Sequence, residues 1–99
     1  MRVGAVVHRM EMVLVTSAFC AACARTRGAL AEAVRLVPAV GLTEIDVARD
    51  PDEAEALGIR VTPTVLLRDD AGVEVFRAEG VPTLPQVLTV IADALPPRA

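Results

Sequence analysis

The chain has 99 residues, of which 54% are hydrophobic and 23% are charged. This size and composition are those of one globular domain with a single core, and they exclude a disordered chain. The net charge is −3, and the ten basic residues, all arginine, are scattered along the sequence, so we expect no nucleic-acid partner. No apolar stretch approaches the roughly 18 residues that cross a bilayer, so we expect no membrane partner either.

Residues 1–9 carry no clear pattern. We interpret them as a possible N-terminal extension in front of a core at about residues 12–95, all within one domain of residues 1–99. The apolar segment 12–24 could imitate a secretion signal, but its removal would delete a predicted strand. With two cysteines and no signal, we expect a cytoplasmic protein.

The first predicted element is a strand at residues 12–17, Met-Val-Leu-Val-Thr-Ser. Its nearly continuous apolar run with β-branched members is typical of a strand that is buried on both faces. The sequence Phe-Cys-Ala-Ala-Cys-Ala follows at residues 19–24. Cys20 and Cys23 therefore lie on the turn that leaves this strand.

A helix is predicted over residues 21–37, because its apolar residues fall on one stripe, and Pro38 and Gly41 end it. Residues 43–47 return to strand character, with apolar residues on one face and acidic residues, among them Glu44, on the other.

The next helix has a recognisable start and end. Asp50 is the expected N-cap, Pro51 fits the first helical position, and Glu53 completes a capping box. Gly58 closes this short helix.

Residues 64–67 and 73–76 are predicted strands that the turn at residues 69–72, Asp-Asp-Ala-Gly, joins into a hairpin. A second capping box at residues 83–86, Thr-Leu-Pro-Gln, opens a last helix with a helical apolar period. The element order is β-α-β-α-β-β-α. The helical crossover between the first two strands predicts that they are parallel.

The position of the two cysteines indicates which chemistry they can perform. Cys20 stands near a helix N-terminus, where unpaired N–H groups and the positive end of the helix dipole favour a thiolate. Cys23 lies one turn further on, so the first thiol can attack a disulfide and the second can resolve the mixed disulfide that results. Three other interpretations stay open: a small structural staple, two buried spectator cysteines, and a dimer that pools its cysteines around a metal ion.

These cysteines, together with residues 58–64, Gly-Ile-Arg-Val-Thr-Pro-Thr, resemble the thioredoxin superfamily over roughly residues 12–95. A CxxC motif alone is common, and its combination with this Thr-Pro-Thr segment is much more specific. The resemblance implies an α/β fold: a thioredoxin-like three-layer sandwich with a mixed four-stranded sheet in the order 2-1-3-4 and helices on both faces. The family's N-terminal strand and helix are missing from this pattern.

The resemblance also implies a substrate groove. The Thr62–Pro63 bond would be cis and would lie beside the cysteines, with Gly80 bordering the groove. A cis proline lacks an N–H and exposes the backbone of the preceding residue for strand-like pairing with a peptide. Phe19 stands where the family has a tryptophan, and we expect it to keep an apolar shelf there.

A thiol–disulfide oxidoreductase is the implied activity, with Cys20 as the nucleophile and Cys23 as the resolving thiol. The electrons would reside in the redox-active disulfide Cys20–Cys23, so no metal or organic cofactor is expected. Implied partners are disulfide-containing proteins and an electron donor, either a thioredoxin-reductase-type enzyme or glutathione. The alternative on the same fold is a non-catalytic or redox-sensing binding module.

One departure from the family concerns the proton of the resolving thiol. Thioredoxins bury an aspartate behind the cysteines, and Leu14 takes that position here, whereas Glu44 takes the position of the lysine that pairs with it. We hypothesise that Glu44 accepts the Cys23 proton, with its pKa raised by desolvation. The alternative is a solvated Glu44 on an exposed strand face.

Overall fold

The structure is a computed structural model that describes residues 9–95, so residues 1–8 of the predicted extension lie outside the described residues. Its elements are β1 (Met10–Thr16), α1 (Ala21–Leu36), β2 (Val40–Asp46), α2 (Pro51–Ala56), β3 (Thr64–Arg68), β4 (Glu74–Glu79) and α3 (Leu84–Ala94). The order is the predicted β-α-β-α-β-β-α.

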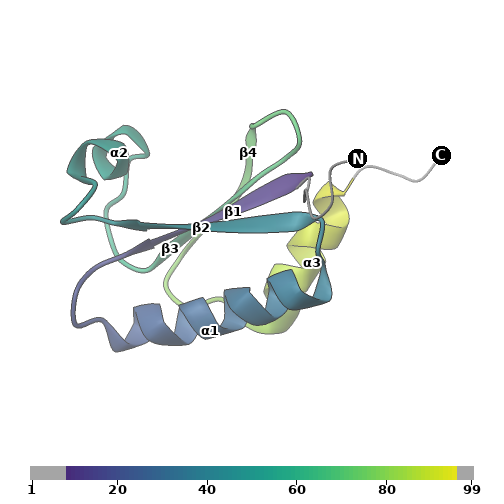
Figure 1. Cartoon of the computed structure of the whole chain (residues 1–99), viewed down its shortest axis with the longest axis horizontal. Coiled ribbons are helices and arrows are strands. Elements are labelled where there is room, and N and C mark those ends of the chain that lie inside the picture. The colour runs from purple at the N-terminus through teal and green to yellow at the C-terminus, as the bar shows by residue number, and fades with distance from the viewer. Residues whose placement is uncertain (1–8, 96–99) are drawn as a thin grey trace, which may run out of the picture.

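The strands form one mixed sheet in the order β2-β1-β3-β4, which confirms the predicted arrangement. β1 and β2 are parallel, whereas β1 with β3 and β3 with β4 are antiparallel. α1 and α3 lie on one face of the sheet and α2 on the other (Figure 1). The three layers are therefore helices, sheet and helix.

The core has two parts because β1 is buried on both faces. Met12 and Leu14 point toward α1 and α3, where they pack with Leu30 and Ile91. The alternate residues of β1 point the other way and form a smaller cluster beneath α2, made of Val13, Val15, Ile45 and Leu66. This two-sided burial explains the continuous apolar run in the sequence.

The second strand is longer than the sequence pattern predicted. Each residue of β1 pairs in register with a residue of β2, from Met10 with Val40 onward. Gly41 was expected to help end the preceding helix, but it lies inside β2. α1 already ends at Leu36. Pairing with β1 therefore extends the strand over residues whose local pattern indicates a turn.

The predicted cap of α2 is wrong. α2 begins at Pro51 as expected, but the Asp50 side chain makes no capping hydrogen bond. The preceding Asp46 carboxylate instead accepts hydrogen bonds from the N–H groups of Ala48 and Arg49, at 2.8 and 3.2 Å. The chain therefore makes its turn at Asp46, before Asp50, and α2 starts without a side-chain cap.

The predicted end of α2 and the predicted start of α3 are confirmed. Gly58 follows α2 with φ +70°, a left-handed conformation that glycine adopts without strain. The capping box of α3 is present, since Thr83 and Gln86 exchange hydrogen bonds of 2.8 and 3.2 Å. Within residues 9–95, no helix is both long and apolar enough to cross a membrane.

Candidate active site

Cys20 occupies the N-cap of α1, at the end of the turn that leaves β1. Its sulfur accepts a hydrogen bond from the Cys23 N–H at 3.0 Å. The first N–H groups of a helix have no partner within the helix, and Ser, Thr or Asp commonly satisfies one of them. Here the sulfur of Cys20 satisfies one of these N–H groups.

Cys20 and Cys23 form a disulfide, with their Cα atoms 5.1 Å apart. The two residues differ in accessibility: Cys20 is half-buried, whereas only 1% of Cys23 is exposed. Cys23 lies on the inner face of α1, the same face as Thr26 and Leu30. A molecule that approaches from solvent therefore meets the Cys20 sulfur first.

The segment around Pro63 lies beside the turn that precedes Cys20. The Thr62–Pro63 peptide bond is cis. The hydroxyl groups of Ser17 and Thr62 are hydrogen-bonded at 2.6 Å, which joins the end of β1 to the residue before the proline. On the other side, the Gly80 N–H donates to the Pro63 carbonyl at 2.9 Å. Gly80 has φ +97°, which explains why a glycine stands there.

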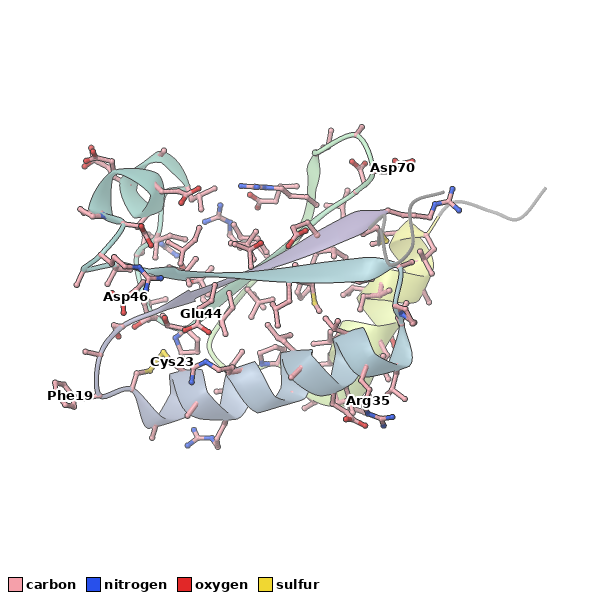
Figure 2. The ribbon with its side chains drawn as sticks, in the orientation of Figure 1. Phe19, Cys23, Arg35, Glu44, Asp46 and Asp70 are labelled. Atoms are coloured by element: carbon pink, nitrogen blue, oxygen red, sulfur yellow. A yellow bond between two sulfur atoms is a disulfide. The ribbon has the colours of Figure 1, made fainter. Side chains whose placement is uncertain are left out.

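The expected apolar shelf at Phe19 is not packed against the rest of the molecule. Its side chain is fully exposed, and Figure 2 shows it pointing away from the rest of the molecule. Its φ of +57° is uncommon for a residue with a side chain, and such conformations gather at functional sites. Val61 and Val81, next to Thr62 and Gly80 in the chain, are also exposed large apolar residues, at 45% and 43%.

Glu44 lies in an ion pair and not in a desolvated site. Arg27 donates to both carboxylate oxygens at 2.7 Å, and the buried Thr16 hydroxyl donates to Oε2 at 3.0 Å. These contacts, the Arg27 hydrogen bonds first among them, lower the pKa of Glu44 against the opposing effect of its partial burial. The predicted rise of this pKa is therefore wrong, because the Arg27 guanidinium lies beside the carboxylate and favours its charged form.

The strand register explains how these groups meet. Glu44 is the partner of Leu14 in the β1–β2 ladder, so its side chain projects toward α1. Arg27 comes four residues after Cys23, one turn further along the same helix, and reaches the carboxylate from there. The pair thus joins α1 to the edge strand β2, behind the buried cysteine.

Three polar residues of this region were not among those predicted from the sequence: Thr16, Ser17 and Arg27. The spacing of Arg27 from Cys23 was a usable signal, since residues four apart on a helix are neighbours. The contacts of Thr16 and Ser17 join residues 28 and 45 positions apart in the chain, and no local pattern indicates them.

Within the part of the chain that the structure describes, no group of three or more His, Cys, Asp or Glu residues could hold a metal ion. His8, the chain's single histidine, lies outside the described residues. A metal shared by two chains, the alternative left open above, would have to draw on Cys20 and Cys23 of each, whose sulfurs are joined to one another in this structure.

No protein-family model and no curated protein matches the sequence. Solved structures do match. Chloroplastic thioredoxin z is 24% identical with a TM-score of 0.77, and the match covers 86% of this chain and 77% of that one. The oxidised form of mitochondrial thioredoxin 3 from Saccharomyces cerevisiae is 21% identical with a TM-score of 0.77, over 87% and 79% of the two chains.

Thioredoxin from Fasciola hepatica is 20% identical with a TM-score of 0.78, and the match covers 90% of this chain and 84% of that one. The arrangement of strands and helices and the disulfide between Cys20 and Cys23 agree with this similarity. This chain is therefore a protein of the thioredoxin fold.

Proposed function

We propose that this protein catalyses thiol–disulfide exchange, with Cys20 as the nucleophile and Cys23 as the resolving thiol. The observation that carries the proposal is the half-buried Cys20 at the N-cap of α1, in a disulfide with the buried Cys23. In the reduced protein, the Cys23 N–H that meets the Cys20 sulfur at 3.0 Å would stabilise a thiolate there. The helix dipole favours the same charge.

The reaction has two exchange steps in the reducing direction. The Cys20 thiolate attacks one sulfur of the substrate disulfide, the substrate S–S bond breaks, and a mixed disulfide forms while the second substrate sulfur leaves as a thiolate. The leaving thiolate takes the Cys23 proton. The Cys23 thiolate then attacks the Cys20 sulfur, the Cys20–Cys23 bond forms, and the other substrate sulfur leaves. Two electrons have passed from the protein dithiol to the substrate.

In this scheme Glu44 is not the proton acceptor. Its carboxylate oxygens already accept hydrogen bonds from Arg27 and Thr16, and its pKa is lowered. Such a carboxylate is a weaker base than an ordinary one, so the leaving thiolate is the better acceptor for the Cys23 proton.

The substrates that fit best are polypeptides that carry a disulfide. The backbone of Thr62 would pair with an extended substrate segment beside Cys20, and Pro63 and Gly80 would shape the groove. The exposed side chains of Phe19 and Val61 would contribute apolar contact. A thioredoxin-reductase-type enzyme or glutathione would return electrons to Cys20 and Cys23.

The scheme uses no metal or organic cofactor, because the dithiol itself holds both electrons. A reducing compartment such as the cytoplasm would keep the two thiols available for this chemistry.

Reduction of insulin by dithiothreitol tests the proposal, with the rate of disulfide loss measured in the presence and absence of this protein. We expect a clear acceleration by the wild-type protein and none by Cys20→Ser. If the wild-type protein gives no acceleration with its cysteines reduced, the exchange function is wrong, and a binding module on the same fold is the better interpretation.

A further inference from the structure

The hydrogen bond between Ser17 and Thr62 joins the two segments that flank the candidate groove. The two hydroxyl oxygens are 2.6 Å apart although the residues are separated by 45 positions in the chain, and both residues are half-buried. Ser17 follows β1 directly and precedes Cys20 by three residues. Thr62 precedes Pro63. We propose that Ser17 is a positioning residue that holds the Thr62 backbone beside Cys20 and thereby lowers the KM for polypeptide substrates.

This inference rests on the proposed exchange function and adds a residue that neither the motif nor the fold indicates. Two other hydrogen bonds hold the same segment: the Thr64 hydroxyl donates to the Val61 carbonyl at 2.6 Å, and the Gly80 N–H donates to the Pro63 carbonyl at 2.9 Å. Both come from the side of the segment where β3 and β4 lie. The Ser17 hydroxyl approaches from the turn that carries the cysteines, so it fixes the distance between the two sides.

The chemistry of two hydroxyl groups suits this task. Either can donate to the other, so the contact needs no particular charge or protonation state and should hold across the working pH range. Because both are half-buried, removing one leaves the other with a poorer choice of partners. Without the contact, the segment around Thr62 is more mobile in the free protein. Ordering it when the substrate binds costs conformational entropy, which weakens binding.

The expected effect follows from the net contribution of one hydrogen bond, which corresponds to a change of about 2- to 10-fold in an equilibrium constant. A polypeptide substrate uses the Thr62 backbone, so its KM should carry this change. A small disulfide such as hydroxyethyl disulfide reaches only the Cys20 sulfur and should respond much less. Steps that involve only the sulfur atoms set kcat, so kcat should change less than KM.

A matched pair of variants isolates the hydroxyl. Ser17→Val and Ser17→Thr have the same branched shape, but only the second keeps a hydroxyl group. Initial rates of insulin reduction with dithiothreitol as electron donor give KM and kcat. We expect Ser17→Val to raise the KM about 2- to 10-fold and Ser17→Thr to restore it. Thr43→Val is the control, since it removes the hydroxyl that donates to Glu11 at 2.7 Å on the edge strand β2.

Thr62→Val removes the same hydrogen bond from the other side, which keeps the test valid if Ser17→Val does not fold. The double variant Ser17→Val with Thr62→Val should raise the KM no more than either single variant, because one contact is lost in all three. Equal KM values for Ser17→Val and Ser17→Thr, or fully additive effects of the two valine substitutions, would overturn the proposal. Failure of the wild-type protein to reduce either substrate would instead count against the exchange function itself.

Discussion

Two consecutive hydroxyl residues serve opposite regions of the molecule: Thr16 is the last residue of β1, and Ser17 follows it directly. Thr16 is buried and points behind the cysteines, where it donates to Glu44. Ser17 is half-buried and points to the front, where it contacts Thr62. Successive side chains at a strand end point to opposite sides, so a single strand positions both contacts.

The two regions differ in what surrounds the cysteines. Behind them, the Arg27–Glu44 ion pair joins α1 to β2, and each group already has a partner. In front, two apolar residues are exposed to solvent: Phe19, which precedes the half-buried Cys20, and Val61, which precedes Thr62. The region behind the cysteines therefore holds α1 on the sheet, whereas the region in front of them is open to a partner. The predictions below test that division, from the largest expected effect to the smallest.

The largest effect should come from the cysteines themselves. Cys20→Ser removes the nucleophile, so the rate of insulin reduction should fall to the rate measured without protein. Cys23→Ser keeps the nucleophile but cannot resolve, so stable mixed disulfides between Cys20 and substrate should accumulate. Mass spectrometry of the unreduced protein after incubation with substrate measures them. Mixed disulfides in Cys20→Ser and none in Cys23→Ser would reverse the proposed roles.

Loss of a fully buried core side chain should affect stability strongly. Leu14 has no exposed surface and lies in the core between the sheet and the two helices. Leu14→Ala should lower the free energy of unfolding by about 2–5 kcal/mol, the usual range for a buried leucine. Urea denaturation measures this. A change below about 0.5 kcal/mol, as at surface positions, would contradict the packing described here.

Phe19→Ala should separate binding from stability. Because the side chain is fully exposed, the free energy of unfolding should change by less than about 0.5 kcal/mol. The KM for a polypeptide disulfide should rise, since the apolar contact with substrate is lost. Leu36→Ala is the control, an exposed apolar residue at the other end of α1. An equal effect of both substitutions on KM would remove Phe19 from the binding surface.

The smallest effect is expected for Glu44→Gln, and it should be seen in stability. The lowered pKa of Glu44 means that its charged form stabilises the folded protein. This contribution is present above the ordinary value of 4.5 and is lost as the pH falls through the lowered pKa. The wild-type protein should therefore exceed Glu44→Gln in stability more at neutral pH than in acid, as measured by urea denaturation at several pH values.

The same variant tests the back of the site for catalysis. The pH profile of exchange above pH 6 should be unchanged in Glu44→Gln, because Arg27 already holds the carboxylate charged. A profile that shifts with this substitution would restore Glu44 as a proton acceptor and would end the division between a structural back and a reactive front.

Local patterns in the sequence predicted the features that depend on neighbouring residues. The strand that ends before Cys20, the helix that begins after it, the hairpin turn and the Thr83 capping box all arise from such patterns. The strand order could be predicted because the Cys and Thr-Pro-Thr segments together resemble one fold.

What the sequence could not predict depends on residues far apart in the chain. The start of β2 is set by its ladder with β1. The pKa of Glu44 is set by Arg27, which lies 17 positions away on another element. In both cases a tertiary contact prevails over the local preference. The missing Asp50 cap has a local cause instead, because the Asp46 carboxylate, four residues earlier, accepts hydrogen bonds from the N–H groups of Ala48 and Arg49.

The relative reactivity of the two thiols tests the central claim most directly. The protein is reduced, treated with a limiting amount of iodoacetamide at pH 7, and each cysteine's alkylation is followed by mass spectrometry of its peptides. The account predicts that Cys20 reacts well before Cys23 and faster than the thiol of free N-acetylcysteine, because the helix N-terminus stabilises its thiolate. Equal rates for both cysteines, neither faster than the free thiol, would contradict it.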